Sequence, residues 1–198
     1  MSAPKEPQPR AARFEQLYRN DPDPWRYETS HYEREKFTAT LAALPRATYS
    51  SALEIGCSIG VLTELLARRC ERLLAIDAAQ TAVRRAAERC RDLPQVRVAG
   101  GHVPDEFPDG AFDLIVLSET GYYLSPADLR ATAERIVSAL TPGGQLLLAH
   151  SVELIDDATM PGDEVHAAFI TGFSTELRHR FGQRRERYRL DLLERVSG

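Results

Sequence analysis

The sequence predicts an α/β protein built on a doubly wound, mostly parallel sheet. Segments typical of strands alternate with segments typical of amphipathic helices from about residue 51 onward. Several of the strand-like segments are apolar throughout, which is typical of parallel strands covered by helices on both faces. With 198 residues, of which 43% are hydrophobic and 27% charged, the chain suits one domain with a sizeable core.

The N-terminal part predicts a flexible tail followed by a capped helix. Residues 1–13 contain no apolar run, which argues against a signal peptide or a membrane anchor. Ser30 and Glu33 form a capping-box pattern. After this pattern, the apolar residues Phe37, Leu41 and Leu44 recur at helical spacing, and Pro45 is expected to end the helix.

The segment from residue 51 to residue 150 predicts five strands and three helices. The strand-like runs are "SALEIG", "RLLAID", "VRVAGG", "FDLIVLSE" and "QLLLAHSV". One helix follows the first run, with Leu62, Leu65 and Leu66 on one face. A second runs from about Ala79 to Cys90 and is expected to bury Val83, Ala87 and Cys90. The third begins after Ser125, with Pro126 at its first position.

Residues 151–198 predict a short helix around residues 163–173 and a closing pair of strands, "ELRHRFGQRR" and "RYRLDLLERV". No internal repeat and no linker to a second domain is visible in the sequence, so residues 14–198 are expected to form one domain. The arginines of the closing strands alternate with other residues, which is typical of a solvated strand face.

The junction between the first strand and its helix is where a ligand is expected. In a doubly wound sheet, ligands bind beyond the carboxyl ends of the strands, and Gly56 and Gly60 lie at that end. The dinucleotide pattern G-x-G-x-x-G fails, because Ser58 and Val61 occupy its second and third glycine positions. No Gly-Lys-Ser/Thr of a P-loop is present either.

The run Glu54-Ile55-Gly56-Cys57-Ser58-Ile59-Gly60 resembles the E-x-G-x-G-x-G signature of class I S-adenosylmethionine methyltransferases, with Ser58 in place of the middle glycine. Asp77 ends the next strand, where a carboxylate could accept hydrogen bonds from both ribose hydroxyls. It could instead cap the helix that starts near Ala79. The resemblance covers residues 53–150 and implies a seven-stranded sheet whose final strand is antiparallel.

A closer resemblance links three segments to the NodS-type nodulation-factor N-methyltransferases. These are "DPDPWRYETSHYEREKFTATLAALP", "ALEIGCSIGVLTELLARRC" and "LSETGYYL". The resemblance implies S-adenosylmethionine as cofactor, an amine of a sugar-containing small molecule as acceptor, and a lid formed by residues 14–45. Thr120 and Gly121 stand where members of that group usually carry two bulky apolar residues, which predicts a different acceptor pocket.

The resemblance also implies the residues that hold the cofactor. In the lid they are Tyr32 and Arg34, with Lys36 as an alternative partner for the methionyl carboxylate. In the core they are Glu54, Gly56, Cys57, Ser58, Gly60, Leu62, Asp77, Ala78, His102, Val103, Ser118 and Glu119. His102 occupies a place where the superfamily often has an aspartate that faces adenine, and it could equally be a surface turn residue. Cys57 is expected to serve the cofactor through its backbone.

The candidates for catalysis are Glu119 and His150, each at the end of a strand on the cofactor side. An amine must be neutral to attack a methyl group, and a carboxylate or an imidazole can ensure this. Glu119 could alternatively bind backbone N–H groups, and His150 could be a packed histidine. The expected acceptor contacts are Trp25, Tyr122, Tyr123 and His166, although packing explains Trp25 and one tyrosine equally well.

Charge and cysteine content predict no nucleic acid, membrane or metal partner. The net charge is −4, and the three cysteines show neither zinc-ligand spacing nor a disulfide framework. We expect a cytoplasmic protein that is a monomer or a homodimer. The alternatives to N-methylation are O-methylation of another small metabolite, or a non-catalytic protein that keeps the fold. An NAD-dependent oxidoreductase is disfavoured by the glycine spacing.

Overall fold

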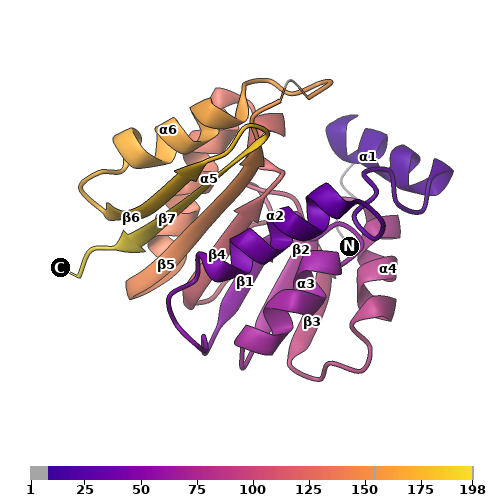
Figure 1. The fold of residues 1–198 in the computed structure, drawn as a ribbon, viewed down its shortest axis with the longest axis horizontal. Helices are drawn as coiled ribbons and strands as arrows, with labels where there is room; N and C mark the ends of the chain where they lie inside the picture. The colour runs from indigo at the N-terminus through magenta and orange to yellow at the C-terminus, as the bar shows by residue number, and fades with distance from the viewer. Residues whose placement is uncertain (1–8, 154, 198) are drawn as a thin grey trace, which may run out of the picture.

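The computed structural model describes residues 9–153 and 155–197 and shows a single seven-stranded sheet with helices on both faces (Figure 1). The strand order is β3-β2-β1-β4-β5-β7-β6. The first five strands in this order run parallel, and β7 is antiparallel to β5. The predicted fold class is therefore confirmed, including the antiparallel final strand.

The strands lie close to their predicted positions. Their bounds are β1 Ala52–Ile55, β2 Leu73–Asp77, β3 Val96–Gly100, β4 Phe112–Ser118, β5 Leu140–Ser151, β6 Leu177–Arg184 and β7 Tyr188–Arg195. The predicted turn before the fifth strand appears as a bulge inside β5. Leu140 pairs with Phe112 of β4 and the next pair is Gln145 with Leu114, so the residues between them have no partner on β4.

Two helical layers cover the sheet because its side chains alternate between the faces. On one face, α2 (His31–Ala42) and α3 (Val61–Leu66) pack on Leu114 and Val116, and α4 (Gln80–Arg89) packs on Ala75. On the other face, α5 (Pro126–Ala139) and α6 (Gly162–Gly172) pack on Ile115 and Leu117. Short 3-10 turns η1 (Ala67–Arg69) and η2 (Gly121–Tyr123) follow α3 and β4.

The helix ends follow the predicted capping chemistry in two of three cases. The Ser30 hydroxyl accepts the Glu33 N–H at the start of α2, and the Ser125 hydroxyl accepts the Asp128 N–H at the start of α5. The third helix, α4, has no capping side chain of its own. Its first turn is instead held by a side chain of the N-terminal helix.

The N-terminal segment differs from the prediction in two ways. The tail ends earlier than expected, because α1 spans Pro9–Asn20 and begins with a proline, which suits the first turn of a helix; residues 1–8 lie outside the described part of the chain. The Glu15 carboxylate of α1 accepts the Thr81 N–H (2.9 Å) and the Thr81 hydroxyl (2.7 Å), so α1 caps α4. By contrast, α2 belongs to the helical layer that packs on the sheet. The part of the predicted lid (residues 14–45) that covers the site therefore consists of α1 and the loop after it.

The buried face of α4 was predicted correctly at Cys90 and wrongly at Val83 and Ala87. Ala82, Ala86 and Cys90 are buried, whereas Ala87 is exposed and Val83 is half-buried. The helix turns its smallest side chains inward because the glycine-rich turn after β1 packs directly against them.

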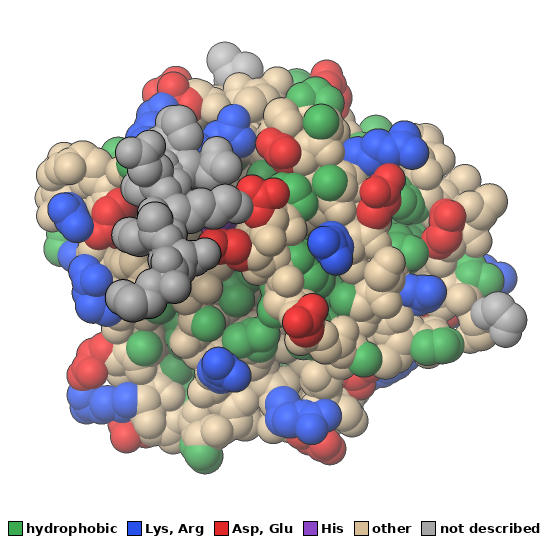
Figure 2. Space-filling model, turned by 180° about the vertical axis from the view of Figure 1, so that it is seen from behind, with side chains coloured by type: hydrophobic (Ala, Val, Ile, Leu, Met, Phe, Trp, Pro, Cys, Tyr) green, Lys and Arg blue, Asp and Glu red, His purple; other side chains and the backbone are tan. Residues whose placement is uncertain are grey.

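The surface mixes charges of both signs. Figure 2 shows acidic and basic side chains interspersed over the face opposite to that of Figure 1. None of the helices in the described ranges has the length and apolarity that crossing a bilayer requires.

Candidate active site

The turn between β1 and α3 adopts left-handed backbone conformations at three positions. Gly56 and Gly60 have φ of +82°, and Ser58 between them has φ of +52°. A Cβ atom on Gly56 would collide with the Thr120 hydroxyl, and one on Gly60 would lie 2.9 Å from the Ala86 Cα. Glycine is therefore required at both positions, for conformation and for space. Ser58 adopts the strained conformation without that freedom.

Two neighbours hold Ser58 in place. The Asp77 carboxylate accepts the Ser58 N–H at 2.9 Å, and the Tyr18 hydroxyl of α1 donates to the Ser58 hydroxyl at 2.6 Å. The second bond explains why serine can replace the middle glycine of the motif, because its side chain is tied to the segment that covers the turn.

Asp77 supports the turn and still faces the cavity. Its other oxygen accepts the Ala79 N–H at 2.8 Å, but α4 begins only at Gln80 and is not capped by Asp77. The capping alternative is therefore wrong. Burial raises the pKa of Asp77 to about 6 against the two backbone N–H groups that lower it. The carboxylate has lone pairs left to accept further hydrogen bonds from a ligand.

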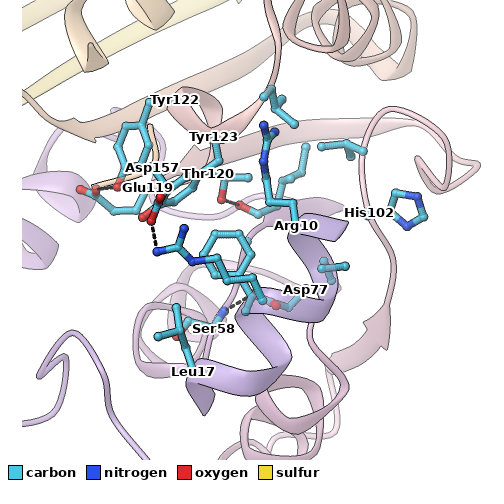
Figure 3. Close-up of a pocket in the computed structure, with 18 of the residues that line it drawn as sticks. Arg10, Leu17, Ser58, Asp77, His102, Glu119, Thr120, Tyr122, Tyr123 and Asp157 are labelled. Atoms are coloured by element: carbon cyan, nitrogen blue, oxygen red, sulfur yellow. Dashed lines mark hydrogen bonds and ion pairs between the residues drawn. The ribbon is translucent and has the colours of Figure 1, made fainter. Parts of the chain in front are cut away.

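A cavity of about 930 Å³ opens at the carboxyl ends of the strands, in front of this turn (Figure 3). Six segments of the chain contribute to its wall. They are α1 with the loop to Tyr27, the turn after β1, the end of β2, the turn around Gly101–Asp105, the residues after β4, and Ile155–Asp157. This is the place that the doubly wound topology predicts for a ligand.

Aromatic rings form a continuous row along one side of the cavity. Phe14 of α1 lies 4.9 Å from Tyr123 and 6.2 Å from Trp25, measured between ring centroids. Trp25 in turn lies 5.2 Å from Tyr18 and 6.0 Å from Tyr27. The negative faces of such rings favour cationic ligands. Trp25 and Tyr123 line the cavity, and their role as acceptor contacts stays a prediction.

Glu119 lies at the centre of a buried ionic cluster beside these rings. One oxygen accepts Lys36 Nζ at 2.7 Å, and the other accepts the Tyr122 hydroxyl and the Ser151 N–H. Lys36 is 2% exposed and also binds Glu33 of its own helix at 2.8 Å. The Glu119 backbone has φ of +51°, which aims the side chain at this cluster. Figure 3 shows Glu119 bonded to Tyr122 on the far side of the cavity from Asp77.

The tyrosines beside Glu119 stay protonated at neutral pH. Burial raises the pKa of Tyr18, Tyr27 and Tyr122 well above its ordinary value, and nearby carboxylates add to the effect. Burial also raises the pKa of Tyr123 to about 12. The cavity wall therefore presents neutral phenols and a carboxylate.

Four predicted cofactor residues lie behind the glycine-rich turn and line a second, much smaller cavity of about 20 Å³. They are Glu54, Cys57, Leu62 and Ser118. Glu54 is 1% exposed, and its Oε2 has no hydrogen-bond partner among the described residues. Burial raises the pKa of Glu54 to about 8. The Cys57 N–H donates to the Ile76 carbonyl oxygen of β2, and the Cys57 carbonyl oxygen accepts the Gly60 N–H within the turn.

Seven predicted cofactor residues line the large cavity: Gly56, Ser58, Asp77, Ala78, His102, Val103 and Glu119. Three others do not line either cavity. Tyr32 packs against the β6–β7 turn, with its hydroxyl 3.1 Å from the Arg187 carbonyl oxygen, and Arg34 is exposed and bonded to the Thr29 carbonyl. Gly60 serves the packing of α3 on α4. For Tyr32 and Arg34 the prediction is wrong, because α2 turns these two side chains away from the sheet edge where the cavity lies.

His150 and His166 also lie outside the cavity. Both are 0% exposed and bonded to each other, His150 Nδ1 to His166 Nε2 at 3.1 Å. His150 Nε2 accepts the Gly121 N–H at 3.1 Å, so neither ring nitrogen is available to an acceptor. Burial, followed by the neighbouring His166, holds the pKa of His150 well below its ordinary value. The structure therefore contradicts His150 as a base and His166 as an acceptor contact.

The sequence reasoning missed Phe14, Tyr18 and Tyr27 in the aromatic row. Phe14 and Tyr18 are four residues apart on α1, which places them on one helical face, and that spacing was a usable signal. The sequence suggests Lys36 only as a ligand of the cofactor. Its place in the ionic cluster could not be predicted, because its two carboxylate partners come together only in the folded chain.

Comparisons with known proteins place the chain in a family. The model of the nodulation protein S (NodS) family matches residues 12–158. The chain is 32% identical over 133 residues to the nodulation protein S of Sinorhizobium fredii, which covers 66% of this chain and 62% of that protein. It thus spans less than two thirds of the length of this curated relative.

Two solved structures are similar to the whole domain. A putative methyltransferase from Pseudomonas syringae is 38% identical with a TM-score of 0.73, covering 84% of this chain and all of that one. The N-methyltransferase NodS of Bradyrhizobium japonicum, solved with S-adenosyl-L-homocysteine, is 27% identical with a TM-score of 0.83, covering 94% of this chain and 99% of that one. The chain belongs to the nodulation protein S family, as its motifs predicted.

Proposed function

We propose that the protein is an S-adenosylmethionine-dependent methyltransferase that N-methylates an amine of an amino sugar or a sugar-containing small molecule. One observation carries the proposal. A cavity of about 930 Å³ has a left-handed glycine-rich turn with Asp77 at one end, and an aromatic row with a fixed carboxylate, Glu119, at the other. The similarity to the N-methyltransferase NodS of Bradyrhizobium japonicum, solved with S-adenosyl-L-homocysteine, supports N-methylation, and the similarity to the putative methyltransferase from Pseudomonas syringae supports methyl transfer.

The residues present fit the cofactor. Gly56 leaves the turn without a Cβ atom, so that a ligand can approach the backbone. Asp77 is placed to accept ribose hydroxyls, and the walls beside adenine would be Ala78 and Val103. When bound, S-adenosylmethionine supplies an electrophilic methyl group carried by a positively charged sulfur. The neutral phenols and aromatic faces of the cavity suit that charge.

The contacts of Glu119 suit it to orient an amine. Its Oε2 already accepts two hydrogen bonds, while its Oε1 accepts only Lys36, which leaves one lone pair for the N–H of an acceptor. These contacts hold the Glu119 side chain in one place. Glu119 thus acts as a fixed hydrogen-bond acceptor that aligns the amine for attack, and alignment is a large part of catalysis in such displacements. The proton released after transfer goes to solvent.

A carboxylate at this position favours an amine over a hydroxyl acceptor, because a hydroxyl needs a base that removes its proton.

The three cysteines are all buried free thiols, and we infer that the protein works in the reducing cytoplasm.

The test is methyl transfer from labelled S-adenosylmethionine to glucosamine, with N-acetylglucosamine as the matched acceptor that lacks a nucleophilic amine. We expect methylamine product from glucosamine only. Glu119→Gln should lower turnover by roughly 100-fold and leave cofactor affinity nearly unchanged, whereas Glu88→Gln on the surface of α4 should change neither. Equal methylation of both sugars would indicate O-methylation, and full turnover in Glu119→Gln would refute the role of Glu119.

A further inference from the structure

A line of buried polar side chains runs behind the cavity, from β5 through α6 to β7. His150 and His166 are 0% exposed and Asp191 is 1% exposed. His150 Nδ1 lies 3.1 Å from His166 Nε2, and His166 Nδ1 lies 2.6 Å from Asp191 Oδ2. Buried polar groups of this kind are costly unless every member has a partner. The proposed reaction uses none of these side chains directly.

The proton positions along this line follow from its two ends. At one end, the Gly121 N–H donates to His150 Nε2, so that nitrogen carries no proton. The neutral ring of His150 then carries its proton on Nδ1 and donates it to His166 Nε2. His166 in turn donates from Nδ1 to the Asp191 carboxylate, which Arg189 also binds at 2.6 Å. The charge of Asp191 thus selects the tautomer of both imidazoles.

The Gly121 end of the line is joined to the cavity. Gly121 opens the η2 turn, which carries Tyr122 and Tyr123 into the cavity wall. A Cβ atom on Gly121 would lie 2.5 Å from Val165 Cγ1 and 3.0 Å from His150 Nε2, so glycine leaves room for both side chains beside the backbone. The ring of Tyr122 also meets the edge of His150, at 5.4 Å between centroids, while its hydroxyl donates to Glu119.

We propose that His150 is a positioning residue of the acceptor site, whose tautomer, imposed by His166 and Asp191, fixes the η2 turn and thereby Tyr122 and Tyr123. The role in acceptor binding rests on the proposed function. Glycine at position 121 leaves the space in which the imidazole of His150 contacts the backbone. His150 acts through Gly121 and Tyr122, and does not touch the acceptor.

The first test needs neither acceptor nor variant. Both Gly121 to His150 and His150 to His166 are N–H···N hydrogen bonds, which transmit couplings between their two nitrogen nuclei in nitrogen-15 NMR spectra. In the wild-type protein we expect a coupling across each bond, and a protonated Nδ1 with a bare Nε2 on His150. The opposite tautomer, or the absence of the Gly121 coupling, would overturn the proposal.

The second test removes the charge that selects the tautomer. Asp191→Asn should speed the hydrogen exchange of the Gly121 amide and shift the resonances of Tyr122 and Tyr123. Asp92→Asn is the control, because Asp92 is exposed beside Arg91 after α4 and has no bond to Asp191, Arg189 or either imidazole. If Asp191→Asn leaves the exchange and both tyrosines unchanged, or the control changes them equally, the positioning role is refuted.

The third test connects the line to function. With glucosamine as acceptor, Asp191→Asn should lower kcat/KM by about 10- to 100-fold, while the dissociation constant of S-adenosylhomocysteine stays within about twofold. An equal loss of cofactor affinity would indicate general damage to the fold and would overturn the proposal. If wild-type protein transfers no methyl group to glucosamine, the proposed acceptor fails, and the two NMR tests still decide the role of His150.

Discussion

Glu54 offers a stability prediction that depends on a single buried carboxyl group. It lies on β1 behind the glycine-rich turn and is 1% exposed, and burial raises its pKa to about 8 from an ordinary value of 4.5. The folded protein therefore favours the protonated form, whereas the unfolded chain ionises freely. Stability from this group is present at low pH and is lost as the pH rises from 4.5 toward 8.

The magnitude follows from the two pKa values. Between them, the folded state binds one more proton than the unfolded state, so the free energy of unfolding falls by about 1.4 kcal/mol for each pH unit. Glu54→Gln keeps the shape and cannot ionise. Relative to wild type, the variant should gain about 3 kcal/mol between about pH 5.5 and about pH 8. The charge of Asp77 is one of the causes that raise the pKa of Glu54, so its effect is already contained in the value of about 8.

The assay is urea unfolding of the ligand-free protein across this pH range, followed by the fluorescence of the single tryptophan, Trp25. Glu71→Gln, at an exposed site just before β2, is the matched control and should track wild type at every pH. A stability difference between Glu54→Gln and wild type that does not change with pH would refute the reasoning, because it would mean that Glu54 is ionised in the folded protein.

Three further predictions concern the turn, the ionic cluster and α1. Gly60→Ala should destabilise the protein in urea unfolding by about 1–2 kcal/mol more than Gly143→Ala. Both glycines have positive φ, but only Gly60 lies against the backbone of α4, and equal losses would rule out a packing contribution. Lys36→Met should cost about 3–5 kcal/mol, since it leaves two buried carboxylates without their cation, and a loss under about 1 kcal/mol would contradict the buried cluster. Tyr18→Phe should speed amide exchange in α1, and unchanged exchange would show that its bond to the turn does not hold the helix.

The fold was largely predictable because its signals are local. Apolar runs marked the strands, and Ser30 and Ser125 marked helix starts that the structure confirms. The position of α1 was harder to predict from the sequence, because Pro9 and the residues after it have no apolar stripe as strong as those of the core helices. Its docking depends on Glu15 meeting Thr81, a contact between residues 66 positions apart.

The site was predictable where it follows the chain, and not where it depends on packing. Gly56 and Asp77 stand at strand ends, and strand ends meet at one edge of a parallel sheet. The expected roles of His150 and of Arg34 failed because a position near that edge does not fix the direction of the side chain. His150 points into the layer beneath α6, and Arg34 points to solvent.

The most direct test of the central claim is a calorimetric titration with S-adenosylhomocysteine. The account predicts a dissociation constant in the micromolar range, about −8 kcal/mol, and no heat from NADH. Asp77→Asn should weaken binding by about 10- to 100-fold, since a charged acceptor is lost. Asp113→Asn is its control, because Asp113 also binds two backbone N–H groups but lines neither cavity, and it should bind like wild type. Binding of NADH without any response to S-adenosylhomocysteine would contradict the account.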